Sequence, residues 1–384
     1  MKLLIEKYQH SLGKWLLQLG YCLFISLSLA QTAAALVYTA SNEFEGNRVI
    51  VFDITDNAGN LVEIGSFPTG GTGTGAPIGN QSALTTDASD RWLFVTNSGD
   101  GTVTSFRLQE NGLEFVNKVY SRGHSPISVT VFGTLVYVLN EGSGLKSDPP
   151  NRRYDNISGF RFGPEGKLSF IRGSVRILDR SQLTSPAQIG FNKSGTVLLI
   201  TEKATNTITT FKMRKHGRPA WRPLKRPSAV PTPFGFEFGD RDYVFITEAN
   251  GGGQGVTASY RVNRKTGEVS SLVDLIDQGD ATCWTVLSSD QTVGYSVNTG
   301  SGDVSLYRIN FDGTIDPFFQ NRPNRMIRTG AGPRDAVLTQ NNQSFITLNN
   351  GDGEIRAFRV RRNGSIARRD AVPIPKSATG LMAR

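Results

Sequence analysis

The stretch WLFVTNSGDGTVTSF, Trp92 to Phe106, contains two apolar runs on either side of a Gly-Asp-Gly turn. This pattern predicts two short antiparallel strands joined by a tight turn, because Gly and Asp tolerate the backbone conformations that such turns need. A spacing of nine residues separates the polar Asn97 from the aromatic Phe106. The same spacing recurs from Glu202 to Phe211, from Asn298 to Tyr307 and from Asn349 to Phe358. The phrase is therefore a repeated structural unit.

Three further copies appear when loop insertions are allowed, which makes seven. We call the polar residue at the start of each turn the anchor. The anchors are Ser41, Asn97, Asn140, Glu202, Glu248, Asn298 and Asn349. Their mean spacing of about 51 residues lies in the range of propellers and solenoids. The spacing therefore favours a single repeat domain over several independent ones.

Each repeat divides into four strands, because the anchor phrase follows one short apolar segment and precedes another. The earlier segments begin with Pro or small residues, as in SPAQIGF and TPFGFEF, and Gly-containing turns lead into the last strand. Four short strands per repeat predict an all-β, seven-bladed β-propeller with four antiparallel strands per blade. The first blade lacks an innermost strand, and residues 377–383 have the composition to supply it. We expect this C-terminal strand to close the ring and remove an exposed edge.

The N-terminal segment has the pattern of a secretory signal peptide. Three lysines precede an apolar run that starts at Trp15 and ends in small residues. We expect residues 1–30 to be the signal and residues 31–384 a single propeller domain, with cleavage after Ala30 or after Ala35. An uncleaved anchor helix is the alternative, although the run is short for a bilayer span. The expected product is a secreted or periplasmic monomer without stable membrane insertion.

The net charge and the cysteine content limit which kinds of partner and which cysteine chemistry we expect. Removing residues 1–30 takes away three lysines and one glutamate, so the net charge falls from +9 to +7. Much of the excess lies in KMRKHGRPAWRPLKRP, residues 212–227, which favours a solvated outer strand; an anionic surface is the alternative. Export argues against a nucleic-acid partner. Cys283 alone would remain, and we expect a buried small hydrophobe rather than a reactive thiol.

Several stretches resemble the seven-bladed propeller lactonase family, in its exported bacterial branch. They include VYTASN (37–42), GSFPTGGTGTG (65–75), TPFGFEF (232–238) and ATCWTVLSSD (281–290). The family also includes 6-phosphogluconolactonase and the fungal carboxymuconate lactonising enzyme. The resemblance implies a site at one mouth of the central channel that uses a Glu, an Arg and a His, although fold alone does not determine function.

The resemblance implies Glu202 as a general acid or base and Arg334 as a bidentate holder of an anionic group. Glu202 and its neighbour Glu248 can instead cap their own turns, as the asparagine anchors do. Catalytic relatives often have Pro-Arg-His or Pro-His where this chain has Pro186, Ala187 and Gln188, so that motif is missing. The expected substrate-binding residues are Glu248, Gln188, Asp335, Ser128, Gln81 and His124. For His124, a surface role is the alternative.

Two functions follow from these observations. The first is an exported hydrolase or cycloisomerase that opens or forms a lactone on a small carboxylated or sugar-derived substrate. The second is a non-catalytic propeller that binds a glycan, a cell-envelope polymer or a protein. No Cys or His cluster has metal-ligand spacing, so we expect neither a metal nor a cofactor. The Gly-rich stretch 70–80 lacks the strand-to-helix context of a phosphate-binding loop.

Overall fold

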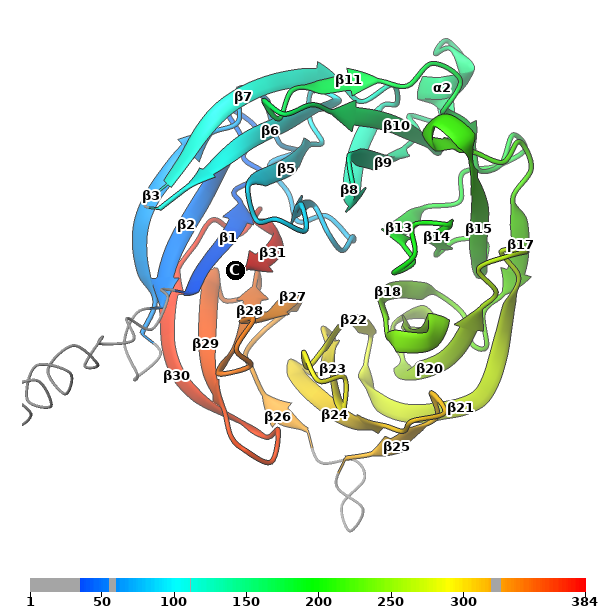
Figure 1. Cartoon of the computed structure of the whole chain (residues 1–384). Helices are drawn as coiled ribbons and strands as arrows, with labels where there is room; N and C mark the ends of the chain where they lie inside the picture. Colours follow the sequence, from blue (N-terminus) through cyan, green and yellow to red (C-terminus); the bar gives the residue numbers. More distant parts are fainter. Residues whose placement is uncertain (1–34, 55–59, 111, 319–325) are drawn as a thin grey trace, which may run out of the picture. The chain divides into compact units, whose positions relative to one another are not determined.

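The computed structural model describes residues 35–54, 60–110, 112–318 and 326–384, and the predicted signal peptide lies outside them. Residues 35–384 form one compact unit made almost wholly of strands. The strands form seven antiparallel sheets arranged in a ring (Figure 1). The predicted fold, a seven-bladed β-propeller with four strands per blade, is confirmed.

The blades are numbered here from the first anchor, and their strands run as follows. Blade 1 contains β1 (Ala35–Ala40), β2 (Arg48–Ile54), β3 (Val62–Pro68) and β31 (Thr379–Ala383). Blade 2 contains β4 (Leu84–Thr86), β5 (Trp92–Asn97), β6 (Thr102–Gln109) and β7 (Gly112–Tyr120). Blade 3 contains β8 (Ser125–Phe132), β9 (Leu135–Glu141), β10 (Asn156–Phe162), β11 (Leu168–Phe170) and β12 (Arg176–Ile177). Blade 4 contains β13 (Pro186–Phe191), β14 (Val197–Glu202), β15 (Thr207–Arg214), β16 (Arg218–Pro219) and β17 (Leu224–Pro227).

The remaining blades follow the same order. Blade 5 contains β18 (Pro233–Phe238), β19 (Tyr243–Glu248), β20 (Gln254–Val262) and β21 (Val269–Asp280). Blade 6 contains β22 (Thr282–Leu287), β23 (Val293–Asn298), β24 (Asp303–Ile309), β25 (Ile315–Pro317) and β26 (Ile327–Arg328). Blade 7 contains β27 (Pro333–Leu338), β28 (Ser344–Asn349), β29 (Glu354–Val360) and β30 (Ile366–Pro373). The helical turns are α2 (Pro150–Arg153), η1 (Lys215–Gly217), η2 (Asp240–Asp242) and η3 (Asn250–Gly252). None of the helices in the described ranges is long and apolar enough to cross a membrane.

The ring closes between the two ends of the described chain. Strand β31 pairs antiparallel with β1, with Val37 opposite Ala383 and Tyr38 opposite Met382. Ser377 adds a hydrogen bond of 2.7 Å from its hydroxyl to the carbonyl of Ser41. Blade 1 therefore takes its innermost strand from the C-terminus, as predicted, and neither end leaves an unpaired inner edge.

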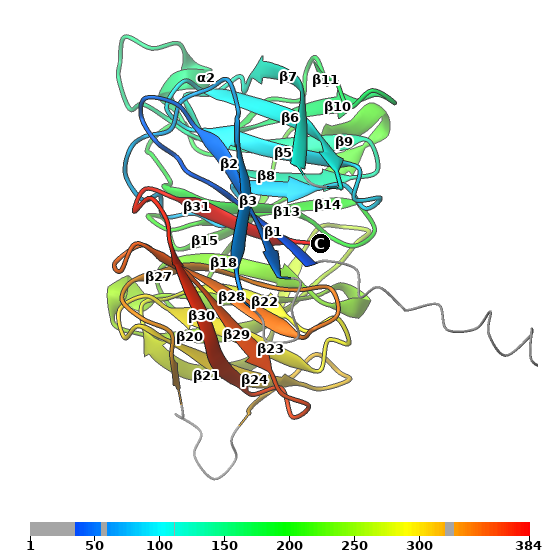
Figure 2. The same cartoon turned by 90° about the vertical axis from the view of Figure 1, so that its left-hand side faces the viewer.

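Apolar side chains fill the spaces between neighbouring blades. One buried cluster joins Leu36, Tyr38 and Val51 of blade 1 to Leu93 and Phe106 of blade 2. Equivalent clusters join the later blades, and the stacked sheets are visible edge-on in Figure 2. Burial of these faces supplies the main driving force for assembling the ring.

The segment between β3 and β4 enters the centre of the ring (Figure 1). We call residues 79–82 the plug. The buried Asn80 donates from its side-chain amide to the carbonyl of Ile127 and accepts from the hydroxyl of Thr379 at 2.9 Å. Its own carbonyl accepts from the indole of Trp284 at 2.7 Å. Asn80 therefore joins the inner strands of blades 3, 1 and 6.

Gln81 also forms hydrogen bonds that join different blades. Its backbone N–H donates to the carbonyl of Ala187 at 3.2 Å, and its side-chain amide donates to the carbonyl of Thr285 at 3.0 Å. Gln81 was predicted to line the channel and bind substrate; its side chain is buried and its amide N–H bonds to blade 6, while its amide oxygen accepts no hydrogen bond in the described chain, so substrate binding stays a prediction. The plug thus occupies the channel among the inner strands and bonds to four blades.

Replacing Asn80 with Ala should destabilise the propeller by about 3 kcal/mol, because it leaves buried polar groups of two other blades without partners. Urea unfolding measured by fluorescence would give the free energy of unfolding. Asn310→Ala is the matched control, since the amide of Asn310 bonds only within an exposed turn. Asn310→Ala should lower the free energy of unfolding by less than about 1 kcal/mol. Equal losses in the two variants would contradict the cross-linking role of the plug.

Candidate functional site

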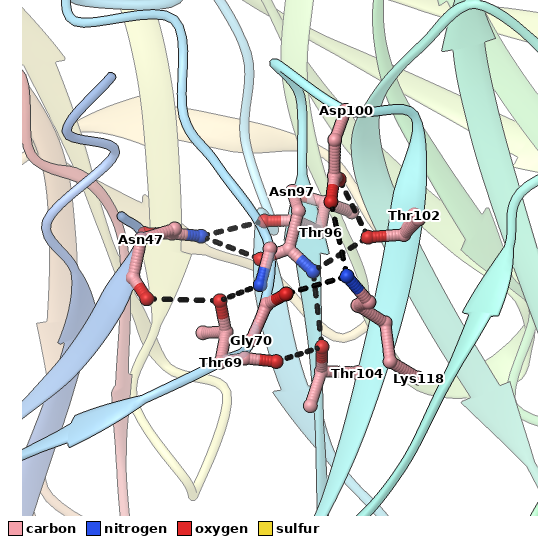
Figure 3. A network of polar contacts seen from close by, with 10 residues as sticks. Asn47, Thr69, Gly70, Thr96, Asn97, Asp100, Thr102, Thr104 and Lys118 are labelled. Atoms are coloured by element: carbon pink, nitrogen blue, oxygen red, sulfur yellow. Dashed lines mark hydrogen bonds and ion pairs between the residues drawn. The ribbon is translucent and has the colours of Figure 1, made fainter. Parts of the chain in front are cut away.

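The anchors point into their own blades. Asn97 donates from its side-chain amide to the hydroxyls of Thr102 and Thr104, each at 3.0 Å, and accepts from the amide of Asn47 at 2.9 Å. These bonds tie β5 to β6 and to the turn of blade 1, as Figure 3 shows. Asn298 repeats the pattern with Asp303 and Ser305, five and seven residues later. The repeated sequence pattern therefore encodes a buried network of hydrogen bonds that holds the turn after the anchor, as seen at Asn97 and Asn298.

Glu202 occupies the same place in blade 4. Its side chain is fully buried, and its carboxylate accepts from the hydroxyl of Thr209 at 2.5 Å and from that of Thr205 at 3.0 Å. The ammonium of Lys225 lies 3.4 Å away. Thr209 stands seven residues after the anchor, as Thr104 does after Asn97. The geometry thus favours turn capping, and a role for Glu202 as acid or base stays a prediction.

Glu248, the anchor of blade 5, is also buried and bonded. Its carboxylate accepts from the hydroxyl of Tyr260 and from the backbone N–H groups of Ala229 and Val230. Burial raises the pKa of Glu248, while these bonds partly oppose the rise. The two glutamates therefore resemble the neutral anchors in their contacts.

The residue after each anchor points toward the inner strands instead, because successive side chains of a strand face opposite sides. Ser98 donates to the carbonyl of Pro126 at 2.6 Å and Thr299 to that of Pro333 at 2.8 Å, each at the start of the next blade's inner strand. Asn350 reaches the carbonyl of Ala378 at 2.8 Å. At this position two neighbouring blades carry charge: Glu141 in blade 3 and Lys203 in blade 4.

Lys203 is held at the edge of the plug. Its ammonium donates to the carbonyls of Gly79 at 2.5 Å and Pro186 at 3.1 Å, and lies 5.1 Å from the ring centroid of Phe234. Burial lowers the pKa of Lys203, whereas the charge of Glu141 raises it. Burial likewise raises the pKa of Glu141, and Lys203 lowers it. The two groups therefore interact electrostatically, and burial brings their pKa values toward each other.

Arg334 belongs to the same end of the ring. It is the second residue of β27, and the neighbouring Pro333 pairs with the anchor Asn349. Its side chain is partly exposed. Within the described ranges its guanidinium forms neither a hydrogen bond nor an ion pair. Both Arg334 and Lys203 lower the pKa of the buried Cys283 thiol, although burial dominates and raises it to about 12. Cys283 is thus a buried hydrophobe between two cations.

Three of the other predicted residues join neighbouring inner strands. Gln188 accepts from the backbone N–H of Phe236 at 2.6 Å and donates to its carbonyl at 3.1 Å. Ser128 accepts from the backbone N–H of Ile189 at 3.2 Å, and Asp335 accepts from that of Leu381 at 2.9 Å. These contacts give all three a bonded, buried place in the ring.

His124 lies in the loop before β8 and is partly exposed. Burial lowers its pKa, Arg152 lowers it further, and Asp148 opposes both. The charges that act on His124 therefore come from the insertion between β9 and β10. No group of three His, Cys, Asp or Glu side chains among the described residues could hold a metal ion.

The amino-terminal part of the chain matches a known family. Residues 31–147 match the family model described as "Lactonase, 7-bladed beta-propeller". The resemblance to the lactonase propellers is confirmed. No curated protein matches this sequence.

Solved structures share this fold over nearly their whole length. A protein from Bacteroides fragilis, titled provisionally as a 6-phosphogluconolactonase, has 16% identity and a TM-score of 0.69, covering 92% of this chain and 99% of its own. The periplasmic gluconolactonase of Pseudomonas aeruginosa has 14% identity and a TM-score of 0.69, covering 91% and 98%. At these identities the likeness establishes the fold.

Glu237 is a further carboxylate among the inner strands of the propeller. Its side chain keeps partial contact with solvent, yet protein surrounds it, and burial raises its pKa to about 7. Its charge in turn raises the pKa of the buried Asp335. Sequence analysis did not single out Glu237, because nothing in PFGFEF distinguishes a channel carboxyl from an exposed one.

The pKa of Glu237 predicts a pH-dependent stability. Because the folded-state pKa is raised from 4.5 to about 7, stability is complete below pH 4.5 and is lost as pH rises through about 7. Glu237→Gln should remove this loss, so the variant should gain about 2 kcal/mol over the parent at pH 8 and little at pH 4.5. Urea unfolding at both pH values is the measurement. A gain independent of pH would contradict the assignment.

Proposed function

We propose that this lactonase-type propeller is an exported enzyme that opens or closes a lactone ring on a small carboxylated or sugar-derived substrate. The site is the mouth of the channel at the anchor end, around Arg334, Lys203 and Glu141. The observation that carries the proposal is Arg334: a partly exposed guanidinium, without a bonding partner in the described chain, at the same end of the ring as the partly buried Lys203 and Glu141. A free guanidinium suits a carboxylate or phosphate, which it can hold with two parallel hydrogen bonds.

Lactone hydrolysis requires a base, a stabiliser of the oxyanion and an acid. Glu141 can take a proton from a water molecule as that water attacks the lactone carbonyl carbon. Lys203 uses two of its three N–H groups on backbone carbonyls, so one is available to the developing oxyanion. The acyl–oxygen bond then breaks, and the ring oxygen takes the proton to give a hydroxy acid. Groups with pKa values shifted toward neutrality suit these transfers.

The purified protein should therefore hydrolyse γ- and δ-lactones, including gluconolactone and 6-phosphogluconolactone, above the spontaneous rate in a pH-stat assay. Glu141→Gln should lower kcat by about 100-fold, because it removes the base. Arg334→Gln should act mainly on KM, raising it about tenfold for anionic lactones only. Arg264→Gln, which breaks an exposed ion pair with Asp242, is the control and should change neither.

Glu202→Gln separates the two assignments of the base. It should lower kcat little, because Gln can still accept from the threonine hydroxyls. Loss of hydrolysis in Glu202→Gln with an unchanged melting temperature would instead support Glu202 as the acid or base. No hydrolysis of any lactone by the parent protein would contradict the enzyme and leave the non-catalytic binding propeller.

The activity should have a bell-shaped pH dependence. It should rise with pH as Glu141 loses its proton, at a pH above the ordinary 4.5 because burial raises that pKa. It should fall again as Lys203 loses its proton, below the ordinary 10.5 because burial lowers that pKa. The pH profile of kcat/KM is the measurement. An alkaline limb unchanged in Lys203→Met would rule out the lysine.

A further inference from the structure

The outer edge of blade 4 carries an exposed tryptophan on an interrupted strand. Strands β16 and β17 both pair with β15, and Ala220 still donates to the carbonyl of Lys212 in β15, whereas residues 221–223 between the two strands form no ladder pair. Trp221 lies in this interruption with 72% of its surface exposed. Among the large apolar side chains of the described residues, only Phe311 has a higher exposed fraction, at 81%.

Arg176 of the neighbouring blade 3 fixes this segment. Its buried side chain donates to the carbonyls of Ala220 at 2.8 Å and Pro219 at 2.7 Å, and to those of Gly173 and Val175. Its guanidinium also lies over the Trp221 ring, 4.9 Å from the centroid. One face of the indole therefore rests on a buried guanidinium and the other is open, which makes a flat, preorganised platform.

The outer part of blade 4 and the adjoining part of blade 3 carry cations that have no acidic partner in the described chain. Strands β15 and β16 place Arg214 directly opposite Arg218, and both act on Arg176 electrostatically. The set comprises Arg161, Arg172, Lys212, Arg214, Lys215, Arg218 and Arg222, all exposed. None of these seven forms an ion pair with an acid of the described chain. Like charges directly opposite each other destabilise a sheet.

We propose that this surface, the Trp221 platform with its seven cations, binds an acidic polysaccharide whose sugar rings carry carboxylates. An open aromatic face stacks on the apolar face of a pyranose ring, and five of the seven cations are arginines, which match the fork geometry of carboxylates. A membrane surface fits less well, because the indole lies flat against Arg176 instead of projecting as an insertable wedge. The bound carboxylates relieve the repulsion between Arg214 and Arg218.

The protein offers a matched control for the aromatic stack. Phe311 is 81% exposed and has the Arg241 guanidinium 3.3 Å from its ring centroid. Its neighbours include the acidic Asp240, Asp290 and Asp312 in place of unpaired cations. Phe311→Ala therefore removes an exposed aromatic ring over an arginine without touching the basic surface.

The test is titration of the purified protein with polygalacturonate by calorimetry at low and high NaCl. We expect binding that weakens as NaCl rises, because salt screens exposed charges. Trp221→Ala and the double variant Arg214→Gln, Arg218→Gln should each weaken it by at least about tenfold, a typical effect of losing a binding anchor. Phe311→Ala should leave it unchanged. The double variant should also raise Tm by about 2 °C in the absence of polymer, since it removes a like-charge pair.

Titrations with three other ligands could give results that contradict the proposal. Equal binding of neutral dextran would overturn the role of charge, and tighter binding of single-stranded DNA or of vesicles rich in phosphatidylglycerol would assign the surface to a different partner. Lost binding in Phe311→Ala, or absence of polygalacturonate binding at low salt, would also overturn the proposal. None of these results depends on lactone hydrolysis, so this inference stands or falls separately from the proposed activity.

Discussion

The structure depends on how the backbone groups that face the channel find hydrogen-bond partners. Seven inner strands that converge on an axis leave carbonyls such as those of Ile127, Ala187 and Thr285 pointing inward, away from any neighbouring strand. Buried carbonyls without partners are costly. Asn80 and Gln81 satisfy these three, in blades 3, 4 and 6, and the bond from Thr379 to Asn80 adds blade 1. The pairing of β31 with β1 closes the ring within blade 1, and the bonds of residues 79–82 add a second closure across the centre.

The fold could be predicted because a short sequence pattern encodes each blade and this pattern recurs seven times. An anchor such as Asn97 and its hydroxyl partner Thr104 lie seven residues apart, so one short phrase encodes the turn, the strand pairing and the buried network. The missing inner strand of blade 1 was equally visible, since residues 377–383 had no other blade to join. Both inferences needed only sequence spacing, and both are confirmed.

The candidate site was harder to predict from sequence spacing than the fold was. Sequence analysis chose the charged anchors Glu202 and Glu248, whereas the chain turns these side chains into their blades and directs the next residues toward the inner strands. A signal existed: of the seven residues that follow an anchor, only Glu141 and Lys203 are charged, and they belong to adjacent blades. The plug could not be foreseen from GGTGTGAPIGN, because its partners come from strands 47 to 299 residues away.

The plug also links the stability of the ring to the chemistry of its mouth. Lys203 is held by the carbonyl of Gly79, a plug residue, and by that of Pro186, at the start of β13. Burial lowers the pKa of Lys203, and residue Gly79 of the plug is part of the protein that bonds to this ammonium. Because the plug fills the space among the inner strands, a substrate that meets Lys203, Glu141 and Arg334 does so at the anchor end. Glu237 lies among the inner strands, and burial raises its pKa because Lys193, the only charge that opposes the rise among the described residues, does not outweigh it.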